Sequence, residues 1–166
     1  TAPDDWGFLA GSTAYGGFIN GFNNGAGWDQ TSYYAGVTLN TPVKGWRVGA
    51  SYDNLNTTEE NLLVATHQYA NALSLYSSIS LTEKLSFHAR GEYAWTGTGL
   101  LGTQPLGGIS DGNSEVFGLT GTIQYDLWKN VLSRLEIRWD HQAGDDEMVG
   151  YGNGDKRNSV LVAANI

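Results

Sequence analysis

The sequence lacks cysteine, has only three prolines and contains no long apolar run. The absence of cysteine excludes disulfide staples, which fits a protein that crosses an oxidising compartment without needing them. No apolar stretch approaches the roughly 20 residues of a membrane-spanning helix. No secretory signal is visible before the opening TAPDDW, so the chain is interpreted as mature protein or a fragment.

Glycine and aromatic residues are abundant in the chain, whereas the helix-forming residues Lys and Glu are scarce. The chain has 23 Gly, 6 Trp and 9 Tyr, and only 16% of its residues are charged. This composition disfavours helices, none of which is expected, and favours β-sheet. The net charge of −8 argues against a nucleic-acid surface. A length of 166 residues predicts a single domain over residues 1–166.

The stretch VLSRLEIRWDHQ at residues 131–142 shows the clearest pattern. Leu135, Ile137 and Trp139 share one parity, and charged residues occupy the other. A period of two over this length predicts a strand with one apolar and one charged face. A soluble sandwich would bury the apolar face, whereas a membrane barrel would turn it to lipid and the charges to a polar lumen.

The same alternation predicts eight strands along the chain. They are expected at residues 6–19, 31–40, 45–53, 68–80, 85–96, 115–126, 131–142 and 157–166. Short connections at 41–44, 82–84 and 127–130 alternate with long ones at 21–30, 54–67, 97–114 and 143–156. In an up-and-down sheet this places all short turns at one end, as in outer-membrane barrels. The predicted fold is therefore an all-β, antiparallel, up-and-down transmembrane β-barrel, or part of a larger one.

Aromatic residues form two sets, which a tilted barrel would place at the two membrane interfaces. Trp6, Trp46, Tyr125 and Trp128 lie beside the short turns or the N-terminus, and Tyr52, Trp95 and Trp139 lie near the long loops. The predicted lipid-facing and girdle residues are Trp46, Tyr52, Trp95, Tyr125, Trp128, Leu135, Ile137 and Trp139.

Charged residues are assigned to the opposite, inward face, with nearly balanced signs. The predicted lumen-lining residues are Arg47, Asp53, His88, Arg90, Glu92, Glu115, Arg134, Glu136, Arg138, Asp140 and Arg157. Buried charges must pair or keep water. They would form a packed salt-bridge plug in a narrow barrel, or a wall that sets solute preference in a wider one. Plain solvation of the lumen explains them as well.

No pattern of a catalytic or cofactor site is found. The three histidines are scattered, no H-x-x-x-H pair exists, and Gly150–Gly154 precedes no helix. The acids at 145–147 could hold a divalent cation, but solvated charge is the preferred interpretation. The sequence predicts no enzyme, no metal and no cofactor.

The last hairpin, EIRWDHQAG at residues 136–144, and the closing strand, KRNSVLVAANI at residues 156–166, resemble Gram-negative outer-membrane porins. The similarity is to the OmpL-like β-barrel porin group. The similarity is clear in the C-terminal third of the chain. In the rest of the chain only the pattern of strands and turns is similar. Such barrels commonly end on an aromatic residue, whereas this chain ends at Ile166. An incomplete barrel, such as the C-terminal portion of a longer porin, is therefore expected.

The predicted function is passive diffusion of small hydrophilic solutes through a multi-pass β-barrel in the outer membrane. Eight strands alone would close around side chains with little room. The alternative is thus a small closed barrel that acts as an anchor, adhesin or envelope-integrity protein without conduction. A secreted soluble barrel or sandwich is a third hypothesis. The expected partners are outer-membrane lipid, lipopolysaccharide and solutes, with a homo-oligomer left open and no nucleic acid.

Overall fold

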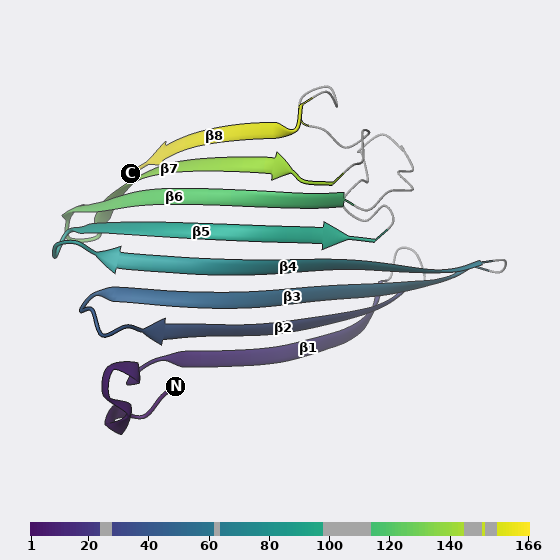
Figure 1. Ribbon diagram of the computed structural model, residues 1–166, viewed down its shortest axis with the longest axis horizontal. Helices are drawn as coiled ribbons and strands as arrows, with labels where there is room; N and C mark the ends of the chain where they lie inside the picture. The colour runs from purple at the N-terminus through teal and green to yellow at the C-terminus, as the bar shows by residue number, and fades with distance from the viewer. Residues whose placement is uncertain (24–27, 62–63, 98–113, 145–150, 152–155) are drawn as a thin grey trace.

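The strands form one eight-stranded antiparallel sheet whose spatial order follows the sequence (Figure 1). The computed structural model describes the chain except for residues 24–27, 62–63, 98–113, 145–150 and 152–155. The strands are β1 (Thr13–Asn23), β2 (Trp28–Asn40), β3 (Trp46–Asn61), β4 (Val64–Ser80), β5 (Leu85–Thr96), β6 (Ser114–Trp128), β7 (Val131–Gln142) and β8 (Asn158–Asn165). The predicted all-β, up-and-down antiparallel class is confirmed.

Strands β5 and β7 begin and end where the alternation predicts, because their polar and apolar residues alternate with few interruptions. The expected strand over 6–19 is wrong in its first half. Residues Asp4–Leu9 form a short 3₁₀ helix, η1, whose first turn carries two aspartates. Its Gly7 has φ +60°, a backbone conformation that favours glycine, and the chain enters β1 only at Thr13.

The hairpin of β3 and β4 is longer than the sequence indicates. The long loop expected over 54–67 is mostly strand, and the pairing continues from Asn54↔Asn71 to Asn61↔Val64. Residues 56–61 are all polar, so the sequence shows no hydrophobic period there to reveal a strand. In Figure 1 strands β3 and β4 extend beyond their neighbours at the end opposite the short turns.

The short turns gather at one end of the sheet, as predicted from the order of the connections. Figure 1 shows the β2–β3, β4–β5 and β6–β7 turns at that end together with both termini. Thr82 Oγ1 accepts hydrogen bonds from the backbone N–H groups of Lys84 and Leu85 in one turn. Gly45 (φ +80°) and Asn130 (φ +67°) supply the left-handed conformations that the other two require.

The register aligns side chains into rows that cross the sheet. One row joins Trp46, Ile79, Phe87, Ile123 and Leu135 through successive strand pairs. The adjacent row, on the opposite face, joins Arg47, Ser78, His88, Thr122 and Glu136. Because paired residues share a face, the sheet has an apolar face and a polar face along most of its width.

None of the hydrophobic side chains in the described part of the chain is buried. Ile137 on the apolar face keeps 52% of its surface exposed. The buried residues of the strands are instead polar, and most lie on the polar face: Ser51, Thr57, Ser74, Thr96 and Gln142, with Asn71 on the other. The polar face is therefore the more enclosed of the two, the reverse of a soluble sandwich.

The sheet is open along both edges in the part of the chain that the structure describes. Strand β1 pairs with β2 alone, and β8 pairs with β7 alone. No helix among the described residues is long and apolar enough to cross a membrane.

Candidate functional site

The register brings nine of the eleven sequence-predicted lumen residues to the polar face. They are Arg47, Asp53, His88, Arg90, Glu92, Arg134, Glu136, Arg138 and Asp140. Arg157 directly precedes β8 with the same parity, and its carbonyl accepts a 2.8 Å hydrogen bond from the Gln142 N–H. That this face lines a lumen stays a prediction.

Glu115 does not lie with the other charges. It pairs with Trp95 and has the parity of Phe117, so its side chain belongs to the apolar face. The assignment of Glu115 to the charged face is wrong, because an odd position on β6 does not share a face with even positions such as Thr122. Its carboxylate accepts a 2.7 Å hydrogen bond from the Tyr93 hydroxyl.

Four charged residues on β5 and β7 form one connected network. Arg138 Nε donates to both carboxylate oxygens of Asp140 at 2.9 Å, and its Nη2 lies 2.9 Å from Oδ1. Glu92 Oε2 lies 3.3 Å from Arg138 Nη1 and 3.0 Å from Arg90 Nη2. Two cations and two carboxylates balance, so the network is neutral and is partly screened from solvent.

Gly118 provides the space that this network needs. A Cβ at residue 118 would lie 3.0 Å from Asp140 Oδ1 and 3.5 Å from Arg138 Nη2. Gly121, on the other face of the same strand, would bring its Cβ no closer than 3.9 Å to the Phe87 ring. The network therefore depends on glycine, which has no side chain, at residue 118. The pattern of charges in the sequence does not predict this requirement.

We expect Gly118→Ala to destabilise the folded protein by about 1 kcal/mol, because the new methyl group displaces Asp140 from Arg138. Urea unfolding in detergent micelles, followed by tryptophan fluorescence, measures this change. Gly121→Ala is the matched control and should unfold at nearly the wild-type urea concentration. Equal midpoints for the two variants would contradict the assigned role of Gly118.

Three other residues of the polar face, Glu136, Arg134 and His88, bind neutral partners. Glu136 Oε2 accepts a 3.0 Å hydrogen bond from Thr122 Oγ1, and Arg134 Nε donates to Gln124 Oε1 at 3.0 Å. The His88 ring lies between the hydroxyl groups of Ser78 and Ser86, at 2.9 Å and 3.0 Å. Because their partners are neutral, the charges of Glu136 and Arg134 are not cancelled and can act on water or solutes at this face.

Tyr151 is a neighbour of the network that the sequence analysis missed. It lies outside the strands, bridged to Lys156, and interacts electrostatically with Asp140 and Arg138. Burial raises the pKa of its phenol above 10, and the carboxylate of Asp140 raises it further. The phenol is therefore neutral at physiological pH, and it adds a hydrogen-bonding group without changing the net charge.

All eight residues predicted to face lipid share the apolar face: Trp46, Tyr52, Trp95, Tyr125, Trp128, Leu135, Ile137 and Trp139. Near the long-loop end the Trp95 ring centre lies 6.4 Å from that of Tyr52 and 5.5 Å from that of Tyr93. Trp139 contacts Phe117 and His141, and its indole donates a 3.0 Å hydrogen bond to Asn158 Oδ1. This arrangement is typical of an interfacial aromatic belt.

We expect Tyr93→Phe to cost about 1–3 kcal/mol of unfolding free energy, because Glu115 would lose its hydroxyl donor while remaining among aromatic rings. Tyr52→Phe is the matched control. The Tyr52 hydroxyl donates to Asn71 Oδ1, a neutral acceptor that also accepts from Asn54. The control should therefore lose less stability in the same urea titration, and a larger loss would contradict the contribution assigned to Glu115.

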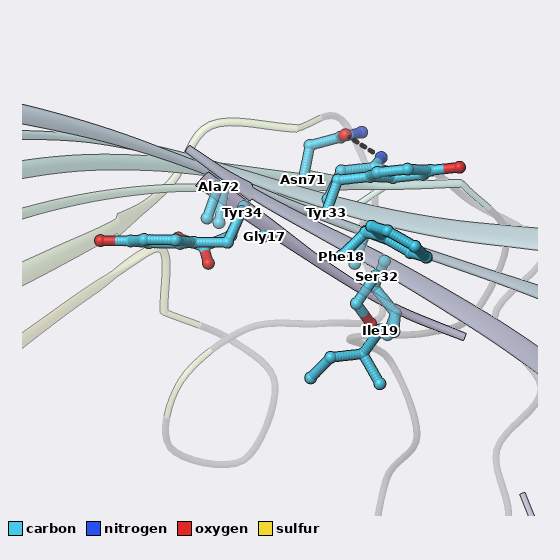
Figure 2. Close-up of a pocket in the computed structure, with 13 residues that line it drawn as sticks. Gly17, Phe18, Ile19, Ser32, Tyr33, Tyr34, Asn71 and Ala72 are labelled. Atoms are coloured by element: carbon cyan, nitrogen blue, oxygen red, sulfur yellow. Dashed lines mark hydrogen bonds between the residues drawn. The ribbon is translucent and has the colours of Figure 1, made fainter. Parts of the chain in front are cut away.

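A hollow of about 510 Å³ adjoins the polar face toward the long-loop end of β1–β5 (Figure 2). Figure 2 shows Ile19, Tyr34 and Ala72 on one side of the sheet, and Phe18, Tyr33 and Asn71 on the other. The register agrees, because Tyr34, Asp53, Ala72 and Ala94 form one polar-face row. Within that half of the face, the hollow is lined largely by apolar and small residues, including Leu55 and Ala70.

Metal sites are not found among the residues that the structure describes. The acids at 145–147, weighed above as a cation site, lie outside those residues.

Comparison with known protein families supplies one match. The family model described as "Putative beta-barrel porin-2, OmpL-like" matches residues 9–166, nearly the whole chain. No curated protein and no solved structure matches the chain.

Proposed function

Because this chain belongs to the OmpL-like family of β-barrel porins, we propose that it forms a water-filled path for the passive diffusion of small hydrophilic solutes across an outer membrane. Membership of this family points to an outer-membrane β-barrel and to a non-enzymatic channel. In the proposed state the strands cross the membrane repeatedly, with lipid and lipopolysaccharide against the apolar face.

The observation that carries the proposal is the division of the sheet into two faces. Leu135 and Ile137 are about half exposed on one face, while Arg134, Glu136 and Arg138 alternate with them on the other. Exposed apolar rows that continue across several strands are stable against acyl chains but not in water. The polar rows then face the axis, where they lower the free-energy cost of moving a hydrophilic solute across hydrocarbon.

Unsatisfied polar atoms on the polar face support a wet environment. Among the described residues, Arg90 Nε and Thr120 Oγ1 are buried without a hydrogen-bond partner. Buried polar atoms in folded proteins are nearly always hydrogen-bonded to protein or to ordered water. Water along this face would satisfy both atoms, and the charges of Arg134 and Glu136 would bias which solutes enter.

A closed barrel without conduction is the second candidate, and the strand count favours it. The described sheet has eight strands, and a barrel of eight has an interior only just wide enough for side chains. The Arg90–Glu92–Arg138–Asp140 network would then fill the interior as a plug. Such a barrel would serve as an anchor, adhesin or envelope-integrity protein.

Single-channel recording in planar bilayers separates the two candidates. Refolded protein that conducts through open-channel steps supports the diffusion path. A protein that inserts, as shown by its protection from added protease, yet produces no steps supports the closed barrel. Protein that stays monomeric and folded in water without detergent contradicts both, because an exposed apolar face would not tolerate those conditions.

A further inference from the structure

Asp53 is an isolated negative charge in the hollow on the polar face. None of the described residues forms an ion pair or hydrogen bond with its carboxylate. Its neighbours in the row are Tyr34 on β2 and Ala72 on β4, neither of which neutralises it. Asp53 is exposed, so its carboxylate is available to a cation supplied from solution.

The basic residues of the polar face lie too far away to serve as its counterion. Arg47 is six positions along the same strand, a distance of about 20 Å at the usual rise per residue. Arg90 lies two strands away and four positions nearer the short turns, roughly 16 Å by the usual strand spacings. Both distances exceed the screening length of about 8 Å at physiological salt.

Tyr34, the cross-strand partner of Asp53, directs its ring along β2 over Gly36. A Cβ on Gly36 would lie 2.6 Å from the Tyr34 hydroxyl oxygen and 3.1 Å from its Cζ. The ring therefore lies along its own strand over the bare backbone of Gly36, flanked by Tyr15. Tyr34 and Asp53 both line the hollow, and an aromatic ring together with a carboxylate is a combination that attracts organic ammonium groups.

On the polar face, the other residues that line the hollow are apolar and mostly short, except for Ser32. Ile19 and Leu55 lie toward the long-loop end, and the methyl groups of Ala72 and Ala94 leave room over β4 and β5. A hollow of about 510 Å³ is within the size range of small-molecule sites. It can accommodate a small apolar body against Ile19 and Leu55 while that body's charged group lies beside Asp53.

We infer that this hollow is a binding site for small amphipathic amines, which place an ammonium group against Asp53 and Tyr34 and an apolar body against Ile19, Leu55 and Ala72. The site deepens the proposed diffusion function and rests on it, because the polar face must be open to solutes. It names a solute class that this path would retain longer than neutral or anionic solutes of equal size.

Isothermal titration calorimetry of the folded full chain in detergent micelles tests this inference, with phenethylamine as the probe. We expect saturable binding of phenethylamine and none of 2-phenylethanol or phenylacetate, which have the same ring without the positive charge. Asp53→Asn should weaken phenethylamine binding by about tenfold or more, because a charged hydrogen bond is lost. Asp126→Asn, the same change at the other end of the polar face, should leave binding unchanged.

A second variant keeps the test independent of any folding defect at Asp53. Ala72→Leu retains the carboxylate but fills the hollow, and it should also weaken binding in protein whose circular dichroism remains that of a β-sheet. Equal affinity of wild type and both variants, or equal binding of the neutral alcohol, would overturn the site. Binding does not require conductance, so a silent bilayer recording together with Asp53-dependent binding would reject the diffusion path alone.

Discussion

Ile137→Arg is expected to prevent the protein from inserting into lipid bilayers. Ile137 lies in the apolar row between Gly121 and Val162, with 52% of its surface exposed. If this row faces acyl chains near the midplane, an arginine there costs about 2–4 kcal/mol. Leu135→Arg, in the next apolar row, should act similarly. Folding into liposomes, followed by the band shift of unheated protein on a gel, measures the loss.

The matched control places the same residue on the opposite face. Thr122→Arg lies one row away from Ile137 and brings its guanidinium beside Glu136, the present partner of the Thr122 hydroxyl. Its insertion yield should remain close to that of wild type, as should that of Arg134→Leu, which disturbs only the polar face. Equal tolerance of arginine on both faces would refute the assigned orientation of the sheet.

Glu92→Gln is expected to have the largest effect of any single change on the polar face. Glu92 is the carboxylate that Arg90 and Arg138 share, so its removal leaves two guanidinium groups facing each other with one counterion, Asp140. We expect a loss of about 1–3 kcal/mol in unfolding free energy. We also expect the reversal potential in a potassium chloride gradient to shift toward chloride, because the face gains positive charge.

Glu136→Gln separates these two effects. It removes the same charge from the same face, but its carboxylate accepts from a threonine hydroxyl instead of bridging two arginines. The reversal potential should shift in the same direction, with a clearly smaller change in the urea midpoint. If Glu136→Gln destabilises the protein as much as Glu92→Gln, the four-residue network is not a structural unit.

The sequence was most informative where one face of a strand is wholly apolar and the other charged. On β7 and β5 the alternation located the strand ends and the face of Ile137, Arg138 and Glu92. It failed where this contrast is absent. Residues 56–61 in the outer half of the β3–β4 hairpin are all polar, so the register there depends on backbone hydrogen bonds between strands. Residues 4–9 fold into η1 because of local turn geometry at Gly7.

The sequence by itself determined the all-β class and the separation of apolar from polar side chains, since both depend on a period of two. It also determined the up-and-down order, which depends on the alternation of short and long connections. Only the tertiary structure decided which charges meet. Arg138 on β7 contacts Glu92 on β5 across the intervening strand β6, in a space that Gly118 leaves open. Asp53 lies in its hollow without a partner among the described residues. Such contacts depend on register between distant segments, which local patterns do not encode.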